Sequence, residues 1–168
     1  MRIPLVPIFV WLFIVIVLLA LLAAVAGQLG LLQRTPPTDL GVREGKLKPP
    51  SMTENSVTSQ AALYPDHPQR NYADIAPLPV KGDGPATLAR IKAIVEGMGG
   101  AKVVKSDPDY LYAQFTTRFM KFVDDVEFWF DPAGSVIQVR SASRVGRRDF
   151  GVNRKRIEAV RAELAATQ

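Results

Sequence analysis

The stretch from Leu5 to Ala26 constrains the fold most, because it runs for 22 residues without a charged side chain. At about 1.5 Å per residue, a helix of that length spans roughly 33 Å, enough to cross a hydrocarbon core of about 30 Å. The rest of a 168-residue chain is too small to bury a helix that is apolar on every side. The sequence therefore predicts a transmembrane anchor over residues 1–32.

Two questions about this anchor stay open. Ala24-Val25-Ala26 before Gly27 fits a signal-peptide cleavage site, yet the apolar run exceeds the roughly 7–15 residues of a signal peptide, so we favour an uncleaved anchor. Its orientation is not fixed by charge. Arg2 favours a cytoplasmic N-terminus, whereas four basic residues after the helix favour the opposite orientation: Arg34, Arg43, Lys46 and Lys48.

Residues 33–70 are rich in proline and polar residues and show no sustained periodicity, which is typical of a linker. As a flexible coil, such a linker would place the following domain about 35 Å from the bilayer. The segment 55–61 is less generic, because Asn55, Ser59 and Gln60 offer more hydrogen-bonding groups than a plain tether needs. We expect this segment to dock on the domain, near arginines such as Arg118.

Residues 71–168 show the patterns of one α+β domain. Apolar residues recur every three to four positions from Pro85 to Met98 and again from Asn153 to Ala165, which predicts two helices. Between them the sequence predicts four strands, at Ala101–Lys105, Tyr110–Thr117, Phe122–Phe130 and Val136–Ser143. We expect a two-layer fold: a four-stranded, mainly antiparallel sheet with both helices on one face and the other face partly open.

Enzyme motifs are missing from the sequence. It has no cysteine, no glycine-rich phosphate loop and no nucleophile elbow, and its single histidine, His67, lies in the linker. Three carboxylates, on Asp124, Asp125 and Glu127, share one predicted strand, where we expect them to neutralise arginines on the neighbouring strand. The sequence therefore predicts no catalytic residue, no metal and no cofactor.

Positive charge is concentrated near the C-terminus. Residues 140–161 hold eight basic and two acidic side chains, a net charge of +6. Three consecutive cations, from Arg154 to Arg156, begin the last helix, where the helix dipole disfavours them. A bound anion would resolve this conflict. The candidate anion-binding residues are Arg140, Arg144, Arg147, Arg154 and Arg156.

For a domain held near a bilayer, anionic phospholipid is the leading ligand. Nucleic acid is disfavoured, because the aromatic residues that would stack on bases are not interleaved with the arginines. We assign the remaining polar residues to a structural network: Asn55, Ser59, Gln60, Arg118, Asp124, Asp125, Glu127, Asp149 and Asn153.

Several motifs together are familiar: Asn55–Gln60, Asp109–Leu111 with Phe115–Arg118, Phe122–Phe128, Arg140–Gly146 and Asp149–Arg156. From about Gly41 to Leu164 the chain closely resembles the domain of unknown function 1499 family. The resemblance implies a mostly bacterial, often anchored or exported protein, and favours an extracytoplasmic domain. It supplies no established activity. Two cysteines that many members carry are matched here by Pro50 and Ser56.

The sequence thus predicts a non-enzymatic, membrane-anchored envelope module that binds an anionic ligand such as phospholipid headgroups through its arginine-rich region. One alternative is an assembly subunit of a membrane protein complex, which would use the open sheet face around Trp129. A second alternative is a carboxylate-dependent enzyme.

Overall fold

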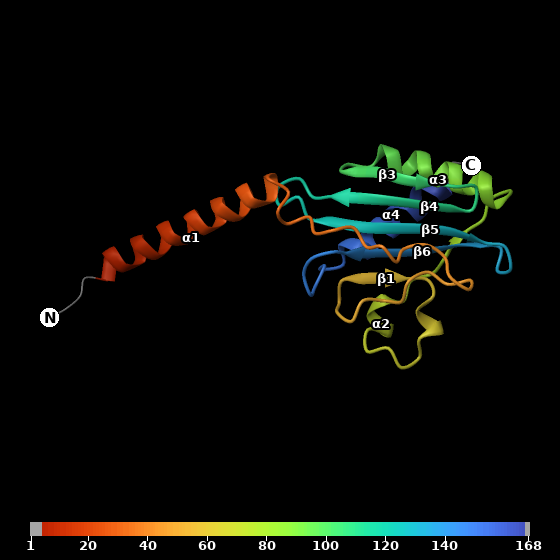
Figure 1. Cartoon of the computed structure of the whole chain (residues 1–168), viewed down its shortest axis with the longest axis horizontal. Helices are drawn as coiled ribbons and strands as arrows, with labels where there is room; N and C mark the ends of the chain where they lie inside the picture. The colour runs from red at the N-terminus through yellow and green to blue at the C-terminus, as the bar shows by residue number, and fades with distance from the viewer. Residues whose placement is uncertain (1–4, 167–168) are drawn as a thin grey trace.

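The computed structural model describes residues 5–166, and its most prominent feature is helix α1 (Leu5–Gln28), which projects from the rest of the protein (Figure 1). The large apolar side chains of α1 are exposed from Ile8 to Val25, with Trp11 and Phe13 each 66% exposed. Within Pro7–Gln28, the most apolar window of 18 residues has a mean hydropathy of 3.3. Among residues 5–166, α1 is the one helix long and apolar enough to cross a membrane.

An antiparallel sheet of six strands forms the centre of the domain. The predicted strands are present as β3 (Ala101–Ser106), β4 (Tyr110–Thr116), β5 (Val123–Asp131) and β6 (Val136–Ser143). Two short strands, β1 (Ser56–Thr58) and β2 (Leu78–Pro79), both pair with β6, so the sheet has six strands and not the four predicted. The main order is β1-β6-β5-β4-β3.

Strands β5 and β6 form the hairpin that their alternating apolar and polar residues predict. The turn between them is closed by Asp131, whose Oδ1 accepts from the Ala133 and Gly134 N–H groups at 3.1 and 3.2 Å. This fixes a register that places Phe128 opposite Val139. Because side chains alternate along a strand, Val126, Phe128 and Phe130 of β5 face the helices, while Trp129 and the acidic residues at 125 and 127 face the other side.

Helices α3 (Gly84–Gly97) and α4 (Val152–Ala166) cover one face of the sheet (Figure 1). α3 begins at Asp83, whose carboxylate accepts from the Ala86 N–H at 2.6 Å, with Pro85 in the first turn. The apolar stripes of both helices pack into one core with the sheet, as the predicted two-layer fold requires. The stripe residues with 5% exposure or less are Leu88, Ile91, Val95, Ile157, Val160 and Leu164.

The other face of the sheet is covered, which corrects the expected open face. Residues 39–50, here called the strap, cross it, and Leu47 packs with Trp129 and two tyrosines of β4. Leu47 is 2% exposed and Trp129 is 8% exposed. Trp129 is therefore not available as a docking surface, and the strap is part of the domain.

The expected flexible linker is corrected further along the chain. β1 pairs with β6, with Val57 opposite Ser141, and a 3-10 helix (Ala61–Leu63) and α2 (Arg70–Ala73) follow it. Much of residues 39–73 is therefore folded onto the domain. The strap was not predicted from the sequence, because its apolar residues follow neither the helical nor the strand period. These residues are Leu40, Val42 and Leu47.

α1 contacts the domain directly at its C-terminal end. The Gln28 side chain donates to the carbonyl oxygen of Phe119 at 2.8 Å, in the loop 117–122 that joins β4 to β5. A Cβ on Gly27 would lie 2.6 Å from the carbonyl oxygen of Met120, so this close approach requires glycine. The domain therefore begins where the helix ends, and the 35 Å tether estimated by the random-coil rule does not apply.

Candidate functional site

Three of the four acidic residues of β5, at positions 124, 125 and 127, each face an arginine. The closest N–O distances are 3.6 Å from Arg140 to Glu127, 2.6 Å from Arg144 to Asp125, and 2.6 Å from Arg156 to Asp124. All six side chains are at most 9% exposed. The first two pairs lie beneath the strap, and the third lies on the helix side of the sheet, because side chains alternate along β5.

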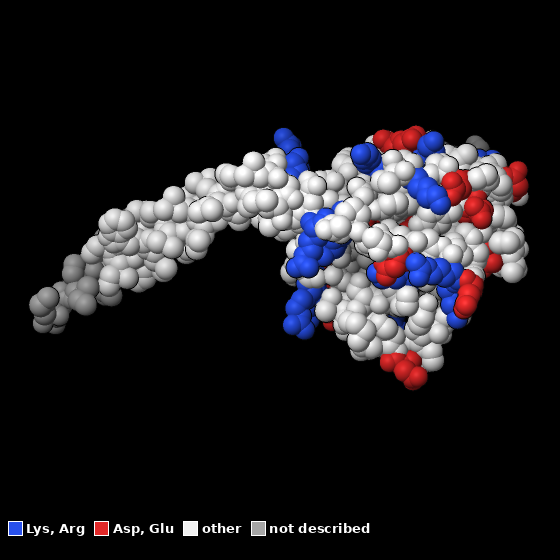
Figure 2. Space-filling model, viewed as in Figure 1, with Lys and Arg blue, Asp and Glu red and all other residues white. Residues whose placement is uncertain are grey.

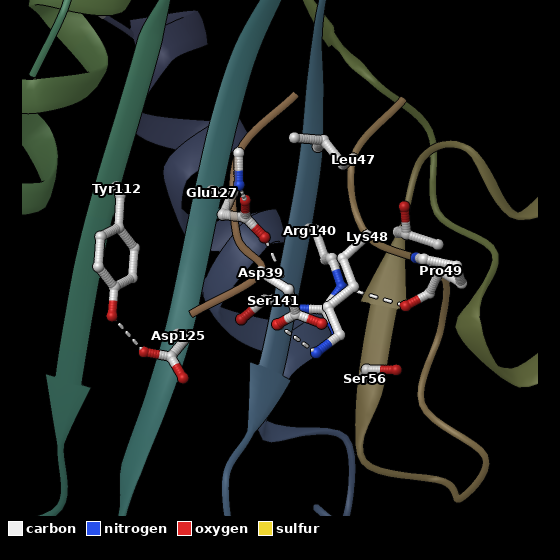
Figure 3. Close-up of polar contacts among 12 residues, drawn as sticks. Asp39, Leu47, Lys48, Pro49, Ser56, Tyr112, Asp125, Glu127, Arg140 and Ser141 are labelled. Atoms are coloured by element: carbon white, nitrogen blue, oxygen red, sulfur yellow. Dashed lines mark hydrogen bonds and ion pairs between the residues drawn. The ribbon is translucent and has the colours of Figure 1, made fainter. Parts of the chain in front are cut away.

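Asp125 is held by three groups at once. Its carboxylate accepts from Arg144 Nη2 and Nε at 2.6 and 2.8 Å, a bidentate arrangement, and from the Tyr112 hydroxyl at 2.5 Å (Figure 3). Burial and the hydrogen bond to Asp125 raise the pKa of Tyr112. The hydrogen bond to Asp125 also raises the pKa of Arg144. Both Asp125 oxygens are occupied, so the arrangement is that of a structural ion pair.

Glu127 and Arg140 form the most deeply buried pair, with side-chain exposures of 0% and 5% (Figure 3). Glu127 Oε1 accepts from the Gly41 N–H at 2.7 Å and from the Tyr110 hydroxyl at 2.8 Å. Arg140 Nε donates to the Pro49 carbonyl at 3.3 Å. Burial lowers the pKa of Arg140, while nearby carboxylates, Glu127 foremost, oppose that shift.

These contacts have a structural result: both ends of the strap are bonded to the pair, at Gly41 and at Pro49. They also bear on catalysis. Glu127 Oε2 has no hydrogen-bond partner among the described residues. The side chain is nevertheless fully buried, so a substrate cannot reach it, and the carboxylate-dependent enzyme gains no support.

The start of α4 already contains a carboxylate. Asp149 accepts from the N–H groups of Gly151 and Asn153 at 3.0 Å each, and also from the Tyr72 hydroxyl. Burial alone would raise the pKa of Asp149, but hydrogen bonds from Tyr72, Gly151 and Asn153 outweigh it, and the pKa lies below its usual value. Burial and the Asp149 contact raise the pKa of Tyr72 to about 12. An internal anion therefore occupies the place that the sequence analysis gave to a ligand.

The cations at the start of α4 have partners too. Arg154 donates to the carbonyl oxygens of Tyr72 and Asp74 at 2.7 and 2.8 Å. Arg156 bonds Asp124 and stacks on the Phe115 ring, 4.5 Å from its centroid. Of the five arginines predicted to bind an anion, four are thus engaged within the domain. Arg147 is the fifth: it is exposed and has no ion pair within residues 5–166.

The polar residues of the segment 55–61 connect distant parts of the domain. Gln60 accepts from the Leu47 N–H at 2.8 Å and so bonds the strap. Asn55 donates to the Gly146 carbonyl at 2.7 Å, and its own carbonyl accepts from Asn153 Nδ2 at 3.1 Å. Ser59 bonds Gln138 on β6. Arg118 lies apart from these residues, in the exposed loop 117–122.

Two loops at the end of the domain that α1 contacts carry features that the sequence analysis missed. The phenylalanines Phe119 and Phe150 are 71% and 86% exposed. Arg118, Lys121 and Arg147 lie in the same loops, and no ion pair to them occurs among residues 5–166. We call these five residues the membrane-side surface. Figure 2 shows blue side chains gathering on the edge of the domain nearest α1.

A cavity of about 760 Å³ adjoins this surface. It lies between the turn from α3 to β3, the end of β4, the loop 117–122 and the start of α4. Its lining residues are Met98, Gly99, Gly100, Phe115, Thr116, Thr117, Arg118, Lys121, Val152 and Arg156. A signal for this region was present in the sequence, because Arg118-Phe119-Met120-Lys121 interleaves basic and apolar residues where a surface turn is normally polar.

A family model described as "Protein of unknown function (DUF1499)" matches residues 46–164. The chain belongs to this family. The DUF1499 match begins within the strap and ends within α4, so it includes all six strands and every residue of the three ion pairs. No curated protein and no solved structure matches the chain. The DUF1499 assignment thus identifies the fold unit and names no activity.

Proposed function

We propose that this protein is a single-pass, membrane-anchored module that binds anionic lipid headgroups with its membrane-side surface. The observation that carries the proposal is the combination of three cations that have no carboxylate partner among residues 5–166 and two exposed phenylalanines, at the end of the domain that α1 contacts. Of the arginines predicted to bind an anion, only Arg147 belongs to this surface. The exported location stays a prediction from the family resemblance.

The position of the loop 117–122 supports the proposal. The Phe119 carbonyl accepts a hydrogen bond from Gln28, the last residue of α1. A helix that spans a bilayer ends near the headgroup level, so the Phe119 side chain would lie in that layer. Exposed apolar side chains are costly in water, and segments that lie in the membrane interface bury Phe, Trp or Leu there while Lys and Arg face the headgroups.

Charge supports the same orientation. Each lysine or arginine near a negatively charged leaflet contributes about 1 kcal/mol to membrane association. Arg118, Lys121 and Arg147 could therefore contribute about 3 kcal/mol together, and the exposed Arg34 follows α1 on the same side. The three buried arginine–carboxylate pairs contribute nothing here, because their charges are neutralised inside the domain.

The test is a depth measurement on the full chain in nanodiscs. Because the chain has no cysteine, Arg148→Cys introduces a unique spin label on the loop 144–151, and Ala133→Cys places a control label in the turn between β5 and β6. We expect phosphatidylglycerol, compared with phosphatidylcholine alone, to shield the label at 148 from a water-soluble relaxation agent. The label at 133 should not respond.

A charge-matched pair of variants completes the test. Arg118→Gln/Arg147→Gln should abolish the response at position 148. Arg70→Gln/Arg90→Gln removes two exposed arginines from α2 and α3 and should leave the response intact. Equal shielding in both lipids, or an undiminished response in the first variant, would overturn the proposal.

A further inference from the structure

We infer that the 760 Å³ cavity beside the membrane-side surface binds one acyl chain of an anionic bilayer phospholipid. This inference rests on the proposed function, because it assumes that the membrane-side surface meets the bilayer. It adds a defined site to that function, in which the cavity holds the acyl chain of one lipid per protein. Electrostatic attraction to the surface alone would instead involve many headgroups that exchange with one another.

The size and location of the cavity suit this ligand. Small-molecule sites typically measure about 300–1,000 Å³, and the cavity lies within that range at about 760 Å³. It is lined in part by the loop 117–122, which bonds the end of α1 through Gln28. A lipid in the adjoining leaflet could therefore insert a chain without leaving the membrane.

The floor of the cavity is apolar. It is formed by Phe115, which is 5% exposed, with Met98 and Val152 beside it. Arg156 contributes a flat wall, because its guanidinium lies over the Phe115 ring and its charge is neutralised by Asp124. The space above Gly99 is empty, since a Cβ there would meet no atom within 4 Å. Burying a chain here removes apolar surface from water on both partners.

The rim of the cavity is cationic and selects the headgroup. The lining includes Arg118 and Lys121, which have no carboxylate partner among residues 5–166, and it contains no aspartate or glutamate. A neutral hydrophobic ligand would not neutralise these two positive charges, and a zwitterionic headgroup would bring its own cation close to them. A single net negative charge next to an acyl chain matches both parts of the cavity.

The structure offers a matched pair of glycines for the test. Gly99 lines the cavity and its φ lies outside the left-handed region, so Gly99→Leu adds a bulky side chain to the cavity lining without backbone strain. Gly97 is the last residue of α3, is also free of neighbours within 4 Å of a Cβ, and does not line the cavity. Gly97→Leu is therefore the control.

The experiment releases the full chain from nanodiscs of equal phosphatidylglycerol and phosphatidylcholine content and counts retained lipids by native mass spectrometry. We expect one phosphatidylglycerol per chain in the wild type and in Gly97→Leu, and at least tenfold less in Gly99→Leu. Equal retention of both lipids, or unchanged retention in Gly99→Leu, would refute the inference.

The spin-label response at position 148 separates this inference from the proposed function. If Gly99→Leu keeps the response while wild type and variant retain lipid equally, the surface binds headgroups and only the cavity site is refuted. If the wild type shows no response to phosphatidylglycerol, the proposed function fails and the inference fails with it.

Discussion

The strap-covered face of the sheet and the membrane-side surface use the same side chain in opposite ways. Beneath the strap, Arg140 and Arg144 are at most 5% exposed and each faces a carboxylate of β5. At the membrane-side surface, Arg118 and Arg147 are exposed and face none within the described chain. The difference teaches that arginine density along a sequence does not locate an anion site. What matters is which arginines the fold leaves without an internal partner.

The strongest test of this comparison is to remove one member of the most buried pair. Arg140→Met leaves the Glu127 carboxylate buried without its cation, and should lower the free energy of unfolding by about 3–5 kcal/mol. Denaturant unfolding of the full chain in detergent measures this.

Two control variants make the result specific. Arg147→Met changes an exposed arginine and should stay within about 0.5 kcal/mol of the wild type. Glu127→Gln/Arg140→Met removes both charges and should recover part of the loss. If Arg147→Met is as damaging as Arg140→Met, the contrast between the two regions is wrong.

The next largest effect is expected at the membrane-side surface. Arg118→Gln/Arg147→Gln removes two cations worth about 1 kcal/mol each near an anionic leaflet, so the docked population should fall about 30-fold relative to the undocked one. Spin-label accessibility at position 148 measures the ratio. The unfolding free energy should hardly change, and a large loss of stability would mean that these arginines are structural too.

A smaller effect is expected at the start of α4. Asp149→Asn weakens the acceptor that binds the Gly151 and Asn153 N–H groups and should cost about 1 kcal/mol. The pKa of Asp149 lies below its ordinary value in the folded state, because hydrogen bonds from Tyr72, Gly151 and Asn153 outweigh the effect of burial. Its stabilisation is therefore present above about pH 4 and is lost as the pH falls through the folded pKa. Unfolding measured against pH should show a shallower acid limb in Asp149→Asn.

The smallest effect concerns Tyr72 and appears only at alkaline pH. The pKa of Tyr72 is raised from 10.0 to about 12, so the folded state holds this proton more tightly than the unfolded state does. Stability should therefore decline as the pH rises from 10 towards 12. Tyr72→Phe should make that decline less steep in thermal unfolding curves. An identical slope would show that the hydroxyl does not contribute.

The sequence predicted the repeating elements well and the connections between them poorly. Strands β3 to β6 and helices α3 and α4 lie within about two residues of their predicted bounds, because alternation and the helical period are local properties. The strap was missed, and the segment 55–61 was expected to dock but not to pair as strand β1, since a few apolar residues between prolines create no period. Their positions depend on contacts with Trp129 and Ser141, far along the chain.

The candidate site shows the same limit. The acidic residues of β5 were expected to pair with arginines on the neighbouring strand. The partner of Asp125 is instead Arg144, which follows the end of β6 and does not lie within it. Its position depends on how the chain leaves the strand. Asp149 was assigned to the structural network, but its hydrogen bonds to the Gly151 and Asn153 N–H groups were not predicted, because they form only if the turn at Gly151 brings the carboxylate back to the start of α4. Arg118 was assigned to the structural network near the segment 55–61, but it is exposed in the loop 117–122. The interleaved basic and apolar residues from Arg118 to Lys121 were a local sign of this surface that was not used.

The contact between α1 and the loop 117–122 has a mechanical consequence. Gly27 packs against the Met120 backbone and Gln28 bonds Phe119, so the helix and the domain are joined without a hinge at that point. With 24 residues, α1 is about 36 Å long, which exceeds a typical hydrocarbon thickness of about 30 Å. Such a helix tilts to fit, and it tilts less in a thicker bilayer. Under the proposed function, the angle at which the domain meets the headgroups would then vary with membrane thickness, and lipid chain length, as well as lipid charge, would affect binding.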